Sequence, residues 1–242
     1  MIVANRLRCL ALVMGGLWLA PAPLSAEEAT ATQPPASAVG ATATWSAEVD
    51  STVSGITLDE KQLAIVAEVN AYFNDITDLK GKFLQTDAEK GQTKGAFLIQ
   101  RPGRFRFDYA SPSTLVVLSD GEYLSFEEQG NPPDRYPLDS TPFGVLFKDK
   151  VDLAQSAKIV ELYADNDLVT ITLEDKSDSS NGRIKLFFAR VDGKLELAEW
   201  VVTSPDGGDT RVELAELVRG EKAEAKLFEL RKISDEAGKP QK

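Results

Sequence analysis

The sequence contains no histidine and only one cysteine in its 242 residues. Without histidine, a Ser-His-Asp triad, a Cys-His dyad, a His-ligated zinc site and a histidine proton shuttle are all excluded. The single cysteine, Cys9, allows neither an internal disulfide nor a cluster of thiolate metal ligands. The G-x-S-x-G and S-x-x-K motifs and a glycine-rich phosphate loop are also missing. We therefore expect a protein that is not an enzyme and that uses no cofactor and no metal.

Positive charge is also scarce, with 27 Lys and Arg against 38 Asp and Glu and a formal net charge of −11. Neutralisation of phosphates is the main source of affinity for nucleic acids. An acidic chain is poorly suited to that task, so we expect no nucleic-acid partner.

The apolar run at the N-terminus, Cys9–Leu19, is too short for a transmembrane helix, which needs about 20 apolar residues. It follows Arg6 and Arg8 and precedes a proline-containing stretch that ends at Ala26. This layout is typical of a secretory signal peptide, which we assign to residues 1–26. The alternative is a short uncleaved anchor. An exported, acidic chain without cysteine after cleavage fits the bacterial periplasm.

Residues 27–55 are rich in Ala, Thr, Ser and Pro and have almost no large apolar side chains. We expect a disordered linker there. One domain should follow over residues 56–233, with a disordered tail at 234–242. No internal repeat is visible.

The clearest predicted helix spans residues 59–74, with Thr57 as its cap and Glu60 completing a capping box. Its apolar residues fall on one face at helical spacing, which predicts that this face packs on an apolar partner. The residues of that face are Ile65, Val66, Val69, Tyr72, Phe73 and Ile76.

After this helix the apolar period changes from 3.6 to 2, which predicts about eleven short strands joined by tight turns. Asp120-Gly121 and Asp192-Gly193 are hairpin signals. The expected strands are 79–86, 93–100, 104–109, 115–119, 123–127, 159–163, 169–174, 183–191, 195–203, 211–219 and 227–232. Such a series predicts an antiparallel meander that curls into a barrel or half-barrel. The interruption at 139–157 predicts one or two short helices, with Pro142 in a first turn, in a lid-like connection.

Phe105, Phe107 and Tyr109 share one face of an alternating strand, while Arg104, Arg106 and Asp108 share the other. A row of aromatics on a curved sheet is either plain core or the wall of an apolar ligand cavity, and periodicity does not separate the two.

Arg101 precedes a Pro-Gly break at the start of the same strand. It is either a solvated charge or a guanidinium fork that holds the carbonyls or a carboxylate of a covering segment. The acidic groups at 165–167, 175–182, 127–128 and 221–224 have the character of turns and solvated faces.

The run from Gly95 to Tyr109, followed by Pro112 and Leu118-Ser119-Asp120-Gly121, resembles the LolA-like outer-membrane lipoprotein carrier proteins. Thr141-Pro142 with Leu146 is similar to the family's short-helix segment. The resemblance covers about residues 60 to 232.

The resemblance implies an unclosed antiparallel β-barrel with a helical lid over an apolar cavity for lipoprotein acyl chains. On this basis we expect the cavity to be lined by Phe97, Phe105, Phe107 and Leu118, and covered by Ile65, Val69 and Tyr72. Arg101 would hold the lid shut in the empty protein. The implied partners are acylated lipoproteins, an inner-membrane ABC-type lipoprotein-releasing complex and an outer-membrane acceptor, bound by a monomer.

Three other functions stay open at this point. The first is a periplasmic regulator that senses lipids or lipopeptides on the same scaffold. The second is a membrane-anchored acceptor, which would need an acylated N-terminal cysteine. The third is a periplasmic hydrolase that uses carboxylates.

Overall fold

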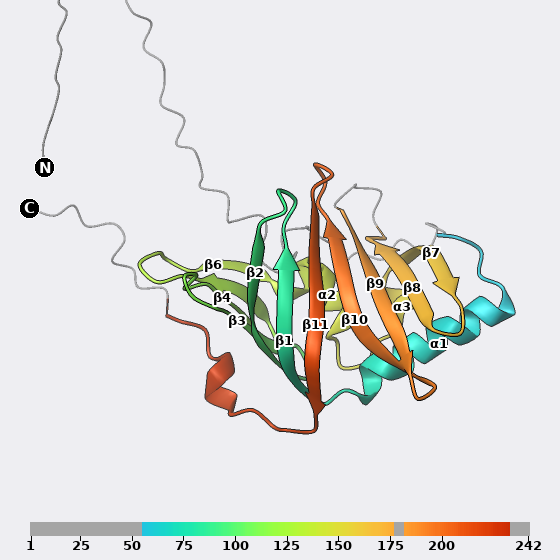
Figure 1. Ribbon diagram of the computed structural model, residues 1–242, viewed down its shortest axis with the longest axis horizontal. Coiled ribbons are helices and arrows are strands. Elements are labelled where there is room, and N and C mark those ends of the chain that lie inside the picture. The colour runs from blue at the N-terminus through green and yellow to red at the C-terminus, as the bar shows by residue number, and fades with distance from the viewer. Residues whose placement is uncertain (1–54, 177–181, 233–242) are drawn as a thin grey trace, which may run out of the picture. The chain divides into compact units, whose positions relative to one another are not determined.

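Eleven antiparallel strands form a single sheet in the computed structural model, which describes residues 55–176 and 182–232 (Figure 1). The predicted signal peptide, nearly all of the predicted linker and the predicted tail lie outside the described residues. The strand order is β6-β5-β4-β3-β2-β1-β11-β10-β9-β8-β7, so β6 and β7 are free edges and the sheet does not close. This arrangement confirms the prediction of a mainly β, unclosed antiparallel fold.

The strands are β1 (Asp78–Thr86), β2 (Gln92–Gln100), β3 (Arg104–Tyr109), β4 (Val116–Asp120), β5 (Tyr123–Glu127), β6 (Asp134–Pro137), β7 (Lys158–Ala164), β8 (Leu168–Glu174), β9 (Arg183–Val191), β10 (Lys194–Thr203) and β11 (Asp209–Arg219). Most of them match a predicted strand within two residues. The predicted strand at 227–232 is wrong, because that segment forms a 3-10 turn, η2 (Ala225–Phe228), and then an unpaired extension. Strand β6, a short edge strand that ends in proline, was not predicted.

Helix α1 (Glu60–Asp75) confirms the predicted helix, but its cap differs from the prediction. Asp59 is the N-cap and forms a capping box with Gln62, so Thr57 is not the cap. The connection between β6 and β7 contains η1 (Leu138–Ser140), α2 (Pro142–Leu146) and α3 (Leu153–Ser156). Among the described helices, none combines the length and the apolar character that crossing a membrane requires.

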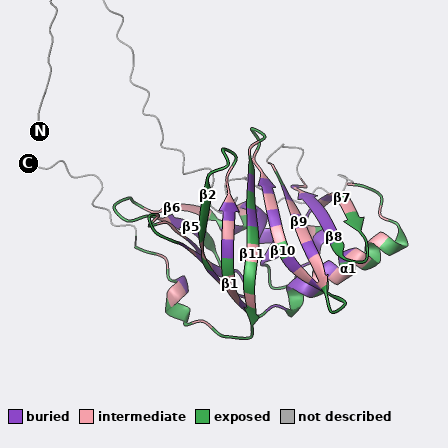
Figure 2. Cartoon of the chain, in the orientation of Figure 1, coloured by how far each residue is buried: buried purple, intermediate pink, exposed green. Residues whose placement is uncertain are grey.

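The concave face of the sheet carries the apolar side chains, and the helices cover it. Buried and more exposed residues alternate along the strands, as Figure 2 shows. On α1, Val66, Val69, Tyr72 and Phe73 are buried toward the sheet, as the helical spacing predicted. The short helices α2 and α3 contact each other, and α3 also contacts α1. The sheet and these helices therefore enclose one core.

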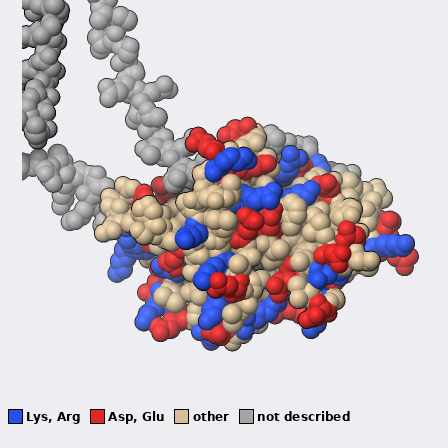
Figure 3. Space-filling model, in the orientation of Figure 1, with Lys and Arg blue, Asp and Glu red and all other residues tan. Residues whose placement is uncertain are grey.

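The opposite, convex face is polar, and Figure 3 shows basic and acidic side chains interspersed on it. Ion pairs link neighbouring strands there, such as Lys82 with Glu216 at 2.8 Å and Lys185 with Glu161 at 2.8 Å. Exposed pairs of this kind each contribute little to stability.

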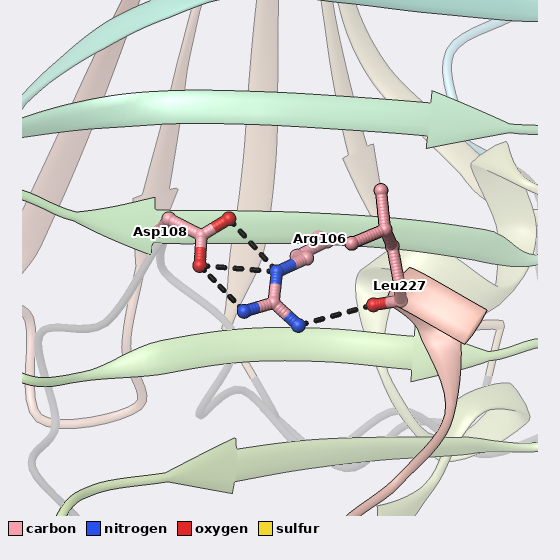
Figure 4. Close-up of polar contacts among 3 residues, drawn as sticks. All are labelled: Arg106, Asp108 and Leu227. Carbon is pink, nitrogen blue, oxygen red and sulfur yellow. Dashed lines mark hydrogen bonds and ion pairs between the residues drawn. The ribbon is translucent and has the colours of Figure 1, made fainter. Parts of the chain in front are cut away.

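The end of the described chain, residues 221–232, crosses the convex face over β3 and β4, and we call it the C-terminal strap (Figure 1). Arg106 of β3 donates to both carboxylate oxygens of Asp108 and to the Leu227 carbonyl at 3.0 Å (Figure 4). Leu118 and Phe228 are fully or almost fully buried in this region. The strap thus shields apolar side chains on the outer face.

Arg106→Leu should loosen this strap. We expect the free energy of unfolding to fall by about 1–2 kcal/mol, because a charged hydrogen bond to a backbone carbonyl is lost. Trypsin should then cleave faster after Lys222 and Lys226 in the native protein. Arg211→Leu, which removes an exposed arginine paired with Glu199 elsewhere on the sheet, is the control. Parental cleavage rates in Arg106→Leu would contradict the role of Arg106.

Candidate functional site

A small apolar cavity of about 30 Å³ lies between the concave face and the helices. A cavity needs about 10–15 Å³ of such volume to hold one water, so this cavity has room for about two or three waters and for no acyl chain. Its walls are apolar or aromatic apart from Arg101. The lining residues are Tyr72, Phe73, Ile76, Leu79, Ile99, Arg101, Phe107, Phe143, Leu146, Phe147, Leu186, Leu197, Trp200 and Leu214.

Phe107 is the centre of the aromatic wall on the sheet side. Its ring stacks on Phe97 with centroids 5.5 Å apart and meets Phe83 and Trp200 edge to face at 5.3 and 6.1 Å. The register explains this cluster, since β2 and β3 pair Phe97 with Phe107 and paired residues point to the same face.

Two of the seven predicted cavity residues, Tyr72 and Phe107, line the cavity. Phe97 and Phe105 are buried beside it on the same face, where they contact Phe107. On α1, Val69 is fully buried and Ile65 is partly buried against the core.

Leu118 lies on the other face of the sheet, so the expectation that it lines the cavity is corrected. The register pairs it with Arg106 of β3 and Ser125 of β5, and Arg106 points to the convex side. The sequence showed that Leu118 is apolar but not that the strap would cover it there. Its neighbour Val117 pairs with Phe107 and faces the core.

Several lining residues were not predicted. Leu186, Leu197 and Trp200 belong to strands whose alternation was recognised, and only the register shows that they face the cavity. Phe143, Leu146 and Phe147 come from the connection that was predicted as a lid.

The side chains of the 138–157 connection, which we call the lid, fill the space above β3. The Phe105 ring lies 5.5 Å from the Phe143 ring and 5.1 Å from the Phe147 ring. All three side chains are buried. The lid therefore fills the apolar space next to Phe105 with its own rings.

Arg101 connects this lid to α1. Its guanidinium donates to the carbonyls of Phe73 at the end of α1, and of Leu146 and Lys148 in the lid. The Leu146 contact is 3.3 Å. Burial lowers the pKa of Arg101, and the nearby Asp149 raises it, so the charge sits in a partly desolvated position. Arg101 is therefore not a solvated charge at a strand end, which was one of the two alternatives from the sequence.

The turn at 101–103 brings the arginine to this position. Gly103 has φ +69°, and a Cβ on it would lie 2.6 Å from Gly121 Cα, so a side chain does not fit there. The Gly103 N–H donates to the Phe147 carbonyl at 2.9 Å, which adds a third bond between the turn and the lid.

Two asparagines one helical turn apart on α1 hold the far end of the lid. Asn74 exchanges two hydrogen bonds with the backbone of Val151, at 3.0 and 2.8 Å. Asn70 accepts from the Leu153 N–H at 3.0 Å. These bonds attach 151–153 to α1, whereas α2 is held to the β2–β3 turn by Arg101 and Gly103.

Asn74→Ala should free the 151–153 segment from α1. We expect a loss of about 1–3 kcal/mol in the free energy of unfolding, since two hydrogen bonds go and backbone groups lose their partners. Urea unfolding measures the loss, with Asp75→Ala on the exposed side of the same helix as the control. Equal stability of the two variants would contradict this attachment.

The acidic groups at 165–167, 127–128 and 221–224 lie in turns and ion pairs, whereas most of the group at 175–182 lies outside the described residues. Asp165 Oδ1 accepts from the N–H groups of Asp167 and Leu168, as expected for a turn. Glu127 accepts from the Arg231 N–H, and Glu221 pairs with Lys80. Within residues 55–176 and 182–232, no three potential metal ligands of the His, Cys, Asp and Glu types are grouped together. This placement gives no support to a carboxylate hydrolase.

Comparison with known proteins finds several relatives named outer-membrane lipoprotein carrier protein. A 74-residue segment is 40% identical to an outer-membrane lipoprotein carrier protein of Alkalilimnicola ehrlichii, covering 28% of this chain and 35% of that protein. A carrier of the same name from Chromobacterium violaceum is 27% identical over 62% of this chain and 75% of its own length. A third, from Halorhodospira halophila, is 28% identical over 51% and 63%. The chain thus spans about a third of the first relative's length and more of the other two.

These names are those of carriers rather than enzymes, which agrees with the expectation from the missing histidine and catalytic motifs. The model of the family described as outer membrane lipoprotein carrier protein LolA matches residues 74–231, well over half of the chain. The matched region includes the end of α1, the whole sheet, the lid and Arg101. The chain belongs to the LolA family of outer membrane lipoprotein carrier proteins.

Proposed function

We propose that this protein is a periplasmic carrier that shields the acyl chains of lipoproteins and ferries them from the inner to the outer membrane. The observation that carries the proposal is an apolar cavity whose lid is made of aromatic side chains and is held by hydrogen bonds from one arginine. Family membership supports the same function.

The size of the hydrophobic effect explains why such a container is required. Burial gains about 0.8 kcal/mol per CH₂, so one chain of about 16 carbons exposed to water costs on the order of 12 kcal/mol. A lipoprotein therefore does not cross an aqueous compartment unaided at a useful rate. A wall of Phe107, Trp200 and Leu186 offers an apolar surface of the required kind.

Loading requires the lid to leave the cavity, because the closed cavity is too small for an acyl chain. In this proposal Phe143 and Phe147 withdraw from Phe105, and the acyl chain takes their place. The bonds that must break first are those of Arg101 to the lid carbonyls and that of Gly103 to Phe147.

Release reverses these steps. The lid rings return to Phe105 and compete with the acyl chain for the same surface, while Arg101 recovers its hydrogen bonds. The empty closed state is thereby stabilised, which favours delivery of the cargo to an acceptor.

The proposed partners are an inner-membrane ABC-type lipoprotein-releasing complex as donor and an outer-membrane acceptor, with the carrier acting as a monomer. Residues 1–26 would direct export, and residues 27–55 would act as a linker outside the binding domain.

The proposed function is tested by adding the purified protein to inner-membrane vesicles that contain lipoprotein and the releasing complex. We expect ATP-dependent transfer of lipoprotein into a complex with the carrier, separated from the vesicles by centrifugation. If no lipoprotein leaves the vesicles with this protein, while a known carrier releases it in the same assay, the proposal is wrong.

A further inference from the structure

A second hollow, on the surface, lies directly beside the apolar cavity. It has a volume of about 590 Å³ and is formed by one side of α1, the β9–β10 turn and the end of β11. Its charged side chains include Glu68, Asp75, Lys194, Glu196 and Arg219. We call it the polar groove, and its position depends on none of the lid contacts described above.

Tyr72 is the residue that separates the polar groove from the cavity, because it lines both. Its ring meets Phe73 and Phe188 edge to face on the core side, each at 5.3 Å. The Arg219 guanidinium carbon lies 5.0 Å from the ring centroid, on the groove side. The Tyr72 side chain therefore lies between an apolar and a polar space.

The hydroxyl group of Tyr72 does not hold the ring in place. Tyr72 is 6% exposed, and its buried hydroxyl makes no hydrogen bond of normal geometry. Burial raises the pKa of Tyr72, and the nearby Leu197 backbone lowers it by a smaller effect. A buried hydroxyl without a good partner is less favourable than a hydrated one, so the closed position of the ring gains little from its oxygen. Arg219, which is exposed on β11, holds the ring through a cation–π contact instead.

We propose that Tyr72 is a gate between the cavity and the polar groove, and that the groove holds the polar head of the cargo whose acyl chain enters the cavity. This inference rests on the proposed carrier function and assigns it a second subsite. The head is the ester-linked glyceryl group and the first residues of the attached polypeptide.

The charge of the groove indicates which heads it accepts. Carboxylates outnumber cations in its lining, and Arg190 already neutralises Glu68 through bonds of 2.6 and 2.8 Å. Asp75, Asp192 and Glu196 then remain beside only two cations, Lys194 and Arg219, which leaves one carboxylate in excess. We therefore expect the groove to favour a neutral or basic peptide head and to disfavour an anionic head.

The gate is tested with the full chain and a fluorescent palmitoyl peptide, by stopped-flow measurement of association and dissociation. Tyr72→Ala should raise both rates by about tenfold or more, because a gate controls passage in both directions. Arg219→Ala should raise both rates about two- to fivefold, the loss of one exposed cation–π contact. Tyr72→Phe keeps the ring and removes the unfavourable hydroxyl, so its rates should equal or fall below those of the parent.

Arg211→Ala, on the same strand but paired with Glu199, is the matched control and should leave the rates unchanged. Should Tyr72→Ala not fold, Arg219→Ala and Tyr72→Phe still decide the matter. The gate proposal is wrong if Arg219→Ala binds and releases the peptide at the same rates as the control. It is also wrong if Tyr72→Phe exchanges the peptide faster than the parent does.

The head subsite is tested with two palmitoyl peptides that carry lysine or glutamate next to the acylated residue. The lysine peptide should dissociate severalfold more slowly at low salt, and the difference should shrink as salt screens the groove. Equal dissociation at all salt concentrations overturns the subsite. If the parental protein binds neither peptide nor palmitate, the proposed carrier function itself is wrong. If the protein binds the peptides but the Tyr72 and Arg219 variants exchange them at the parental rates, only the gate is refuted.

Discussion

Phe105→Glu will lower the free energy of unfolding by about 4 kcal/mol or more and abolish binding of an acyl probe. Phe105 is fully buried, and its ring contacts Phe107 as well as Phe143 and Phe147 of the lid. The substitution removes these ring contacts and places a carboxylate where the lid must close. The charge is then either buried at high cost or hydrated by an opened lid, and both outcomes destroy the apolar site.

Urea unfolding and probe fluorescence measure the two effects of Phe105→Glu separately. Lys94→Glu introduces the same side chain at an exposed position of the adjacent strand β2 and should behave like the parent. Phe105→Leu keeps the site apolar and should cost less than about 1.5 kcal/mol if the lid repacks. A Phe105→Glu protein with parental stability and probe affinity would show that Phe105 does not belong to the core of the binding site.

Arg101→Leu will leave loading intact and reduce transfer to acceptor membranes by at least about tenfold. The guanidinium donates to three carbonyls on α1 and the lid, and a charged hydrogen bond contributes about 1.5–3 kcal/mol where it is desolvated. Losing even one such bond shifts the ratio of closed to open lid about tenfold, since about 1.4 kcal/mol is one decade. Because the closed lid excludes ligand, the variant should retain its cargo.

The transfer experiment loads each variant with lipoprotein, adds acceptor membranes and follows the lipoprotein in both fractions. Arg101→Lys should transfer at an intermediate rate, because an ammonium group does not reproduce a planar fork that reaches separate carbonyls. Arg211→Leu is the control for the loss of one positive charge. If Arg101→Leu folds, loads and transfers as the parent does, Arg101 is a structural residue and not a latch.

The fold was largely predictable because alternation of apolar and polar residues persists through most strands. The segment 104–109 shows this best, since Phe105, Phe107 and Tyr109 are all buried on the side that the pattern assigned to them. The pattern failed at 227–232, where apolar residues cover the outer face of another strand instead of joining a ladder. It also missed β6, which is too short to show any period.

The site was less predictable, because it depends on contacts between distant segments. Binding of carbonyls by Arg101 was one of two alternatives from the sequence, but carbonyls have no sequence signature, and only the turn at Gly103 shows which carbonyls the arginine reaches. Leu118 was assigned to the wrong face because two buried faces meet in β4, so alternation is lost there. Asn70 and Asn74 are spaced to share one face of a helix, yet only the structure shows the backbone they hold.

Native mass spectrometry of the protein isolated from the bacterium that produces it tests the central claim most directly. The account predicts a fraction bound one-to-one to triacylated polypeptide, and a larger bound fraction for Arg101→Leu than for the parent. Finding only empty protein in both preparations, or only phospholipid bound to them, would contradict a lipoprotein carrier.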